Sequence, residues 1–388
     1  MNTEAQAALN TILALIPNKA ARRTFKRALH HNLKADGQPR PQHCKTTSPT
    51  TLSRFYNTLS WDTPAVTRAI QITILKLIQK AYKSTRGMGQ VIKARLDLTT
   101  LEKTGDFPSL PIGVFNAVKG LHIIVLYIGV GTESYPLSYA IWKRPCPSAI
   151  PPVRCVLGSR RCVLWSRKGK GKATLTQLAL GLLKGLKRSL PEQYKIRALT
   201  DTAFGTTQFL ETCFKYGIHA VTGMKCDRTT EQGFQLRELS SRGAMVLLKD
   251  CSVPVWVSWF KLELHGGEFE WRYVVSTKVG DWLTIIRWGR SRWAIEAFFK
   301  AMKGRFGLDQ FGQQTLLGTI RFLLLAFLAF ILTNISRIDK TLLPDWRLLA
   351  LETQKSLFAV LQWGVLERER FELEPYLRKA LQDYASGT

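Results

Sequence analysis

The order of apolar segments between residues 91 and 224 constrains the fold more than any other feature of the chain. Short runs rich in β-branched and aromatic residues predict strands, whereas apolar residues at intervals of three and four predict helices. Gly and polar residues separate the first three strands, as hairpins require. The expected elements are strands at 91–98, 121–130 and 135–142, a helix at 174–190, a strand at 195–200, a helix at 207–216 and a strand at 219–224.

This order predicts the RNase H-like fold, an α/β fold in which a mixed sheet is flanked by helices. Such a sheet brings its first and fourth strands side by side. Asp97 lies on the first strand and Asp201 ends the fourth. We therefore expect the two carboxylates to be near neighbours.

The rest of the chain is organised around this sheet. Helical patterns precede it, and alternating apolar segments interrupt it before helical periodicity resumes from 282 to 306. The expected regions are a helical DNA-binding domain at 1–88, an RNase H-like catalytic domain at 89–225 and 281–338, a β-rich insertion at 226–280 and a C-terminal helical segment at 339–388.

The net charge of the chain indicates a polyanionic partner. Lys and Arg number 56 against 28 Asp and Glu, which gives a formal net charge of +28. An excess of this size repels itself in a compact protein unless a polyanion neutralises it, and nucleic acid is the first candidate. From 134 to 200 the only acid is Glu192. The Gly-rich stretch 166–172 lacks the spacing of a phosphate loop, and its Lys168, Lys170 and Lys172 are expected to lie on the DNA backbone, with a solvated loop as the alternative.

The N-terminal helices carry a second group of basic residues. The segment 19–34 is strongly basic and amphipathic, and it places Arg22, Arg23 and Arg27 on one short helix. Short basic helices suit a helix-turn-helix-like module that binds DNA. An ordinary helical cap on the next domain is the alternative.

Three acids stand in positions where a solitary charge is costly. Asp97 lies within a hydrophobic strand, Asp201 lies at the end of another, and Glu296 lies within a helix. Three carboxylates that meet at one point repel each other unless divalent cations neutralise them. Hard oxygen ligands suit Mg²⁺ or Mn²⁺, and two such ions can support phosphoryl transfer. The alternative for each Asp is pairing with an Arg or with backbone amides, and for the Glu a solvated helix face.

The spacing of three residues around Glu296 resembles a known signature. Arg292, Glu296 and Lys303 follow the pattern of Arg, three residues, Glu, six residues, Lys. This pattern is similar to that of bacterial DDE insertion-sequence transposases, in the branch named after insertion sequence four. A Tyr of that signature is replaced here by Gly289, beside Trp288, which would supply the aromatic contact. The resemblance extends from about residue 90 to residue 335 and includes the surroundings of Asp97 and Asp201.

The resemblance implies a complete reaction. Asp97, Asp201 and Glu296 would hold two Mg²⁺ or Mn²⁺ ions, and Arg292 and Lys303 would grip DNA phosphates, Arg by a bidentate contact and Lys as a point charge. The protein would cut double-stranded DNA at terminal inverted repeats and join the freed 3′-hydroxyl to target DNA. It would act as a homodimer at the bacterial nucleoid, in the cytoplasm. In some relatives an aromatic residue of the insertion stacks on a flipped base, for which the candidates are Trp256, Trp259 and Trp271, with core packing as the alternative.

Two other functions remain open from the sequence. A non-catalytic, domesticated relative would bind DNA with the same net charge but would not need three acids in register. A nuclease of RNase H type would share the sheet, but it would rarely carry the Arg-Glu-Lys helix and the long insertion.

The remaining patterns bear on the compartment. The seven cysteines are odd in number and form no Cys-x-x-Cys pair, which favours a reducing environment. Residues 1–15 lack the basic start of a secretory signal. The most apolar run, 322–332, is too short to span a bilayer and is expected to be a buried core helix, so no membrane partner is expected.

Overall fold

The computed structural model describes residues 3–85, 90–142, 173–263, 267–337, 340 and 344–358. The chain divides into two compact units. Unit 1 comprises Met1–Trp61, Met302–Gln313 and Leu317–Thr388, and unit 2 comprises Asp62–Ala301 and Gln314–Leu316.

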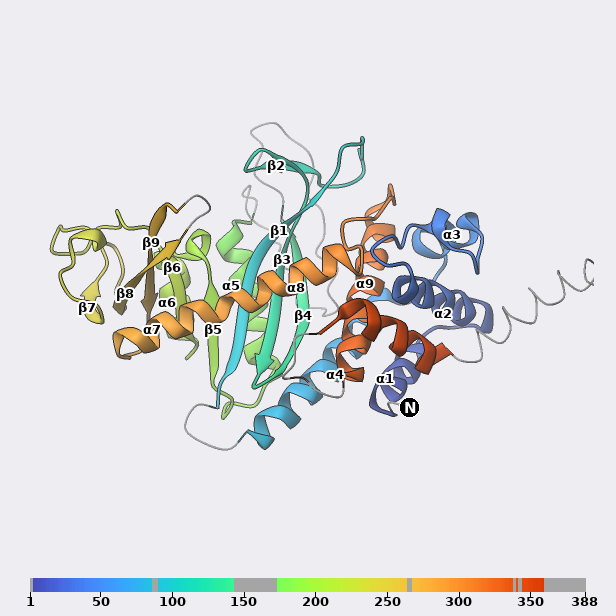
Figure 1. The fold of residues 1–388 in the computed structure, drawn as a ribbon, viewed down its shortest axis with the longest axis horizontal. Helices are drawn as coiled ribbons and strands as arrows, with labels where there is room; N and C mark the ends of the chain where they lie inside the picture. Colours follow the sequence, from blue (N-terminus) through green and yellow to red (C-terminus); the bar gives the residue numbers. More distant parts are fainter. Residues whose placement is uncertain are drawn as a thin grey trace, which may run out of the picture. The chain divides into compact units, whose positions relative to one another are not determined.

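Unit 2 is built on one mixed sheet (Figure 1). Its strands run in the order β4-β3-β1-β5-β6-β9-β8-β7, and the short β2 pairs with the first residues of β3. β1 pairs in parallel with β5, and β5 pairs in parallel with β6, while the other pairs are antiparallel. The predicted mixed sheet, with the first and fourth expected strands adjacent, is thereby confirmed. The strands are β1 (Ile92–Glu102), β2 (Gly113–Phe115), β3 (Val118–Val130), β4 (Glu133–Trp142), β5 (Ile196–Thr200), β6 (His219–Met224), β7 (Ala244–Leu247), β8 (Pro254–Glu263) and β9 (Phe269–Ser276).

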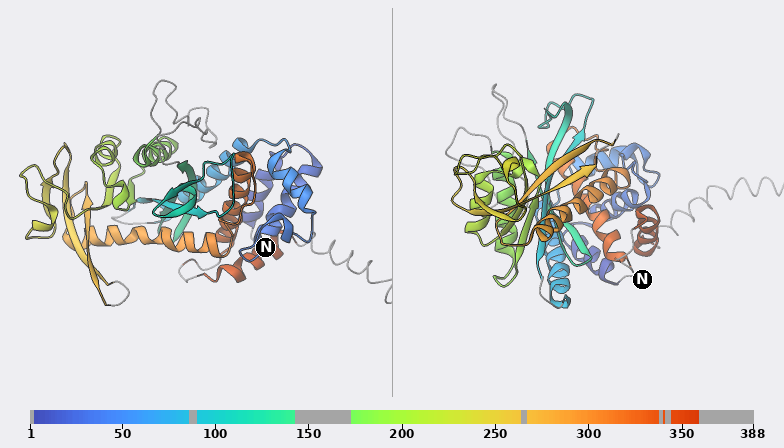
Figure 2. Two further views of the ribbon diagram at one scale, coloured as in Figure 1. Left: turned by 90° about the horizontal axis from the view of Figure 1, so that it is seen from above. Right: turned by 60° about the vertical axis from the view of Figure 1, so that its left-hand side comes forward.

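Helices cover both faces of this sheet (Figure 2). α5 (Leu175–Ser189) and α6 (Thr207–Lys215) lie on one face, and α7 (Trp282–Arg290) runs along the other. α5 begins at a capping box, in which the Thr174 hydroxyl accepts the Gln177 amide and the Gln177 side chain accepts the Thr174 amide. Its buried leucines face the strands, so an amphipathic pattern and a cap suffice to place this helix. α4 (Thr63–Ser84) packs on β3 and β4.

The segment 226–280 continues the central sheet. β9 pairs antiparallel with β6 from Val221↔Ser276 to Met224↔Tyr273, and β8 and β7 add to it in turn. The expected β-rich character is present, but these strands share the backbone hydrogen bonding of the central sheet. A sequence pattern shows which residues form strands and does not show which distant strand they join.

The helix expected from 282 to 306 is broken. α7 ends at Arg290, a 3₁₀ turn spans Ser291–Trp293, and α8 runs over Ala294–Gly304. The Ser291 hydroxyl donates to the Trp288 carbonyl at 2.6 Å, a local contact that often accompanies a bend in a helix. Arg292, between the two helices, is therefore held in a turn.

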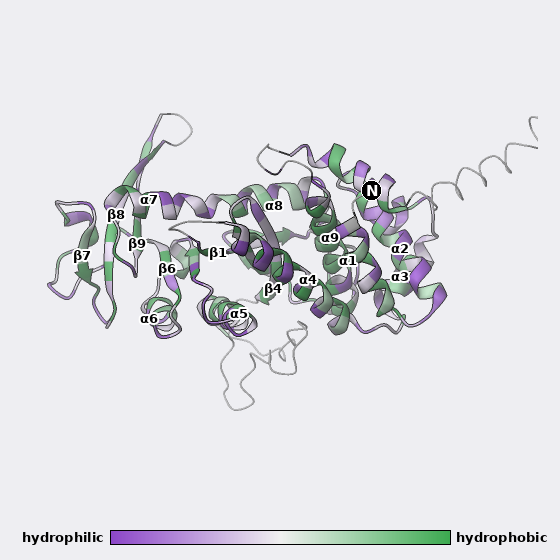
Figure 3. Ribbon diagram, turned by 90° about the horizontal axis from the view of Figure 1, so that it is seen from below, coloured by the Kyte–Doolittle hydropathy of each residue, from purple (hydrophilic) through white to green (hydrophobic). Residues whose placement is uncertain are grey.

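Unit 1 is helical. It contains α1 (Thr3–Ala14), α2 (Lys19–Lys34), α3 (Pro49–Asn57), α9 (Leu316–Ser336) and a helix at 346–358. α9 is hydrophobic along most of its length (Figure 3). It is longer than the predicted apolar run and, by length and composition, could cross a membrane, yet 89% of its most apolar window is buried. This burial supports the prediction of a buried core helix. The prediction that the segment is too short to span a bilayer is wrong, because the helix has 21 residues.

Arg321 is a buried charged residue in the second turn of this apolar helix. Its guanidinium donates to the carbonyls of Phe55, Tyr56, Leu59 and Trp61 at 2.8–3.3 Å, and it lies over the Trp61 ring at 4.4 Å. These carbonyls belong to the end of α3 and the residues after it, where helix geometry leaves acceptors without partners. One arginine therefore ties the end of α3 to α9.

The division into units places two helices differently from the expected regions. α4, expected in the N-terminal domain 1–88, belongs to unit 2, because it packs against β3 and β4. α9, expected in the catalytic domain, belongs to unit 1, because Arg321 and the aromatic residues beside it contact α3. The helix 346–358 falls in the expected C-terminal helical segment, whose remaining residues lie largely outside the described part of the chain.

Candidate active site

The register of β1 and β5 brings two carboxylates together. The parallel pairing ends at Arg95↔Leu199, and Asp97 and Asp201 each lie two residues further along. Residues two apart on a strand share a face, and adjacent strands lie about 4.8 Å apart. Asp97 and Asp201 are therefore neighbours on one face of the sheet.

Asp201 is held by the turn that follows β5. Its Oδ1 accepts the Ala203 amide at 3.1 Å, and its carbonyl accepts the Thr222 hydroxyl of β6 at 2.9 Å. Gly223 lets this turn approach, because a Cβ there would lie 2.8 Å from the Thr202 amide nitrogen. Thr222, which is fully buried, is a positioning contact that the sequence analysis missed.

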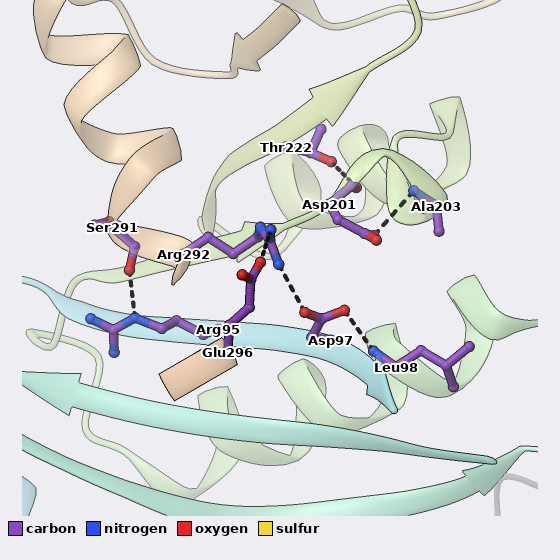
Figure 4. A network of polar contacts seen from close by, with 9 residues as sticks. All are labelled: Arg95, Asp97, Leu98, Asp201, Ala203, Thr222, Ser291, Arg292 and Glu296. Atoms are coloured by element: carbon purple, nitrogen blue, oxygen red, sulfur yellow. Dashed lines mark hydrogen bonds and ion pairs between the residues drawn. The ribbon is translucent and has the colours of Figure 1, made fainter. Parts of the chain in front are cut away.

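Arg292 joins the third acid to the first (Figure 4). Its Nη1 donates to Asp97 Oδ2 at 2.8 Å and its Nη2 to Glu296 Oε1 at 2.5 Å. The side chains of Arg292 and Asp97 are 15% and 14% exposed, whereas that of Glu296 is 56% exposed. The Arg292 guanidinium thus lies between the carboxylates of Asp97 and Glu296. The Glu296 side chain is exposed to solvent, whereas the Asp97 side chain is largely buried.

Burial raises the pKa of both aspartates. Burial, and next the charge of Asp201, raise the pKa of Asp97 to about 6, against the opposing effect of Arg292. Burial also raises the pKa of Asp201, while Arg292 and backbone amides oppose the shift. The two carboxylates are close enough to repel each other, which is the electrostatic state that a bound cation relieves.

The donor set fits a divalent cation in its chemistry. Carboxylate oxygens are the ligands of Mg²⁺ and Mn²⁺, and the acids already hold one cationic group, the guanidinium of Arg292. Among the residues that the structure describes, no group of three or more His, Cys, Asp or Glu side chains is gathered closely enough to hold a metal ion. The Arg292 guanidinium lies between Asp97 and Glu296 and pairs with both.

The raised pKa of Asp97 predicts how metal binding depends on pH. A carboxyl group must lose its proton to bind a metal, so a group with a pKa near 6 binds well above pH 6 and poorly below it. We expect Mn²⁺ affinity to fall about tenfold between pH 7.5 and pH 5, whereas an Asp with the ordinary pKa would change little over this range.

Mn²⁺ titration followed by electron paramagnetic resonance measures this dependence. The variant Glu102→Gln, which removes an exposed acid from the same strand, serves as the control and should keep the pH dependence. An affinity that stays constant down to pH 5 would contradict the assignment of Asp97 as a ligand.

The other predicted DNA-binding residues belong to the end of α8, to α2 and to the segment 166–172. Lys303 lies in the last turn of α8, seven residues after Glu296, or roughly 10 Å along the helix axis. On α2, Arg22 and Arg23 are exposed and Arg27 is half-buried; Arg22 donates to the carbonyl of Ile16 at 2.9 Å. The residues Lys168, Lys170 and Lys172 lie outside the described part of the chain.

Close packing of α7 explains the glycine in the signature. A Cβ at Gly289 would lie 3.0 Å from side-chain atoms of Val274 on β9, so a larger residue there requires Val274 to shift by a few tenths of an ångström. The Trp288 ring packs under the Arg197 guanidinium at 4.1 Å and against the His219 ring at 4.8 Å. Trp288 therefore anchors α7 to the sheet.

The three tryptophans of the 226–280 segment have different surroundings. Trp256 packs partly buried against a hydrophobic cluster of β5, β6, β8, β9 and α7. The Trp259 ring stacks on the Tyr273 ring at 5.7 Å, and the side chain of Trp271 is 50% exposed. Of the three, Trp271 has the exposure that stacking on a base requires.

Comparison with known proteins supports the interpretation of this geometry. Residues 155–332 match the family model described as the transposase DDE domain. The activity of that family is phosphoryl transfer by a transposase, and the matched segment includes Asp201 and Glu296 but begins after Asp97. Comparison with curated proteins gave no match.

One solved structure shares the fold over most of the chain. It is a cryo-EM structure of the piggyBac transposase synaptic complex with hairpin DNA, with a TM-score of 0.50 and 10% sequence identity. The alignment covers 97% of this chain and 81% of that chain. The likeness at this identity concerns the fold alone, a mixed sheet with flanking helices that is consistent with an RNase H-like fold.

Proposed function

We propose that this protein is a DNA transposase of the insertion-sequence-four branch, which cuts the terminal inverted repeats of an insertion sequence and joins them to target DNA. One observation carries the proposal: Asp97 and Asp201 end up adjacent on parallel strands, and Arg292 links Asp97 to Glu296. The match of 155–332 to the transposase DDE domain supports the same function.

In the proposed reaction the three carboxylates bind the metal ions, and Arg292 and Lys303 bind DNA phosphates. Asp97, Asp201 and Glu296 would hold two Mg²⁺ or Mn²⁺ ions, whose chemistry when bound is to activate the attacking water or 3′-hydroxyl and to neutralise the leaving oxygen. Arg292 turns from the carboxylates to a DNA phosphate, which its planar guanidinium holds by two parallel hydrogen bonds. Lys303 contacts a second phosphate as a point charge.

Two transposon ends must be held together for the reaction, so the active form on DNA is a homodimer. Arg22, Arg23 and Arg27 on α2, together with Lys168, Lys170 and Lys172, bind the double-stranded ends through phosphates. The net charge of +28 makes this binding strong at low salt and weak at high salt. The solved piggyBac complex is a synaptic complex with hairpin DNA, and an end released as a hairpin is one outcome of the assay below. The reaction takes place at the nucleoid, in the bacterial cytoplasm.

The function is tested on a plasmid that carries the insertion sequence with both ends. With Mg²⁺ the purified protein should cut at the ends and join them to a second plasmid, and removal of the metal with EDTA should stop cleavage without releasing the DNA. The joined product separates a transposase from an RNase H-type nuclease, which would cut RNA–DNA hybrids without joining. Binding of the ends with no metal-dependent cleavage would overturn the proposal in favour of a non-catalytic relative.

A further inference from the structure

Arg95 is a buried arginine beside the three acids that none of the steps above uses. It lies on β1 two residues before Asp97, so both side chains lie on the same face of the sheet. Its side chain is almost completely buried, with the residue 5% exposed. Its Nε donates to the carbonyl of Ser291 at 2.8 Å, across 196 residues of sequence (Figure 4).

The acceptor of this hydrogen bond is the first residue of the turn that carries Arg292. Ser291–Trp293 is the 3₁₀ turn between α7 and α8, and Glu296 follows in the first turn of α8. A donor on the Ser291 carbonyl fixes the position of the next peptide unit, to which Arg292 belongs. Arg95 therefore ties the turn to the same strand that carries Asp97.

A second contact holds the chain just after Glu296. Tyr127 on β3 pairs across the sheet with Arg95, and the Arg95 guanidinium lies 5.8 Å from the centre of its ring. The Tyr127 ring also stacks on the ring of Phe298 of α8, at 4.6 Å with an interplanar angle of 19°. Arg95 and Tyr127 thus hold the chain on both sides of Glu296, at residues 291 and 298.

Burial of the Arg95 guanidinium costs more free energy than burial of an apolar side chain. Among the described residues, no carboxylate forms an ion pair with it, and its Nη1 is buried without a hydrogen-bond partner. Gly129 makes room for the guanidinium, because a Cβ there would lie 3.1 Å from Nη1. Burial of a charge without an ion pair costs free energy, so filling of the space does not by itself explain an arginine here.

We propose that Arg95 is a positioning residue for the active site: through Ser291 and Tyr127 it sets where Arg292 and Glu296 lie relative to Asp97. The proposal rests on the function proposed above. Misplacement of reacting groups by about 1 Å costs on the order of a hundredfold in rate, so a fixed turn has a measurable consequence.

The test compares Arg95→Met and Arg95→Lys with Lys93→Met. Lys93 lies on the same strand and face, so its variant also removes a cation from β1 but leaves the turn untouched. At saturating DNA and Mg²⁺, Arg95→Met should slow single-turnover end cleavage by about 10- to 100-fold, with DNA affinity within about twofold of the wild type. Arg95→Lys, which keeps a donor, should recover part of the rate, and Lys93→Met should cleave at the wild-type rate.

Hydrogen exchange at residues 291–296 gives a readout that is independent of cleavage. These amides should exchange faster in Arg95→Met than in the wild type and Lys93→Met. If wild-type protein does not cleave DNA but this difference is seen, the positioning contact stands and the proposed function fails. If wild-type protein cleaves and folded Arg95→Met cleaves equally fast, or if Arg95→Lys is no faster than Arg95→Met, the positioning role is wrong.

Discussion

Replacing Asp97 with asparagine is expected to reduce end cleavage by at least about a thousandfold while the protein keeps its fold and its affinity for end DNA. The amide keeps the shape of the carboxyl group but supplies one neutral oxygen in place of a charged ligand. Because burial and Asp201 raise the pKa of Asp97 to about 6, the ionised carboxyl group is held at a cost at pH 7.5. The free energy of unfolding of the variant should therefore equal or exceed that of the wild type at this pH.

The measurement combines plasmid cleavage, DNA binding and urea unfolding on one preparation. Asp201→Asn and Glu296→Gln should behave alike in cleavage, since the three acids act as a unit. Glu102→Gln, which removes an exposed acid from the end of β1, should cleave normally. An Asp97→Asn protein that cuts within tenfold of the wild type would show that Asp97 is not a metal ligand.

Replacing Arg321 with methionine is expected to lower the free energy of unfolding by about 3–5 kcal/mol. Methionine restores the apolar volume of α9 but leaves four buried or part-buried carbonyls, those of Phe55, Tyr56, Leu59 and Trp61, without the donor they share. Burial lowers the pKa of Arg321 to about 10, so the arginine is still charged at neutral pH, and part of the loss is offset because a buried charge is removed.

Urea unfolding followed by circular dichroism tests this expectation. Arg321→Lys keeps the charge but not the branched set of donors, and it should lose an intermediate amount. Arg54→Met removes an exposed arginine from α3 and should change the free energy of unfolding by less than about 0.5 kcal/mol. A loss below about 1 kcal/mol for Arg321→Met would mean that water satisfies the carbonyls equally well.

Local pattern was enough to predict the part of the fold that positions two of the acids. The runs that became β1, β3 and β5 are rich in β-branched residues, and their order implies that β1 lies beside β5. The adjacency of Asp97 and Asp201 followed from that order alone. The pairing of β9 with β6 did not, because it depends on backbone contacts between segments some fifty residues apart, and hydrophobic alternation contains no information about a partner.

Contacts that long side chains make with distant elements were the part of the site that the sequence did not predict. Residues four apart on a helix lie close together, and Arg292 does contact Glu296. The spacing did not show that the guanidinium also reaches Asp97 on β1, because that contact depends on the break between α7 and α8. Arg95 was missed for a similar reason; the only local sign was a basic residue two positions before an acid within a hydrophobic strand.

The segments of unit 1 are far apart in the sequence, so they are synthesised at different times. The first segment ends at Trp61 and α9 begins to contribute at Leu317, roughly 250 residues later, which at 5–20 residues per second is a delay of about 13–50 s. When α9 leaves the ribosome it has the length and composition of a membrane anchor. The carbonyls that bind Arg321 have already been synthesised by then. Rapid capture of α9 by these waiting helices would protect the nascent chain from membrane-targeting factors.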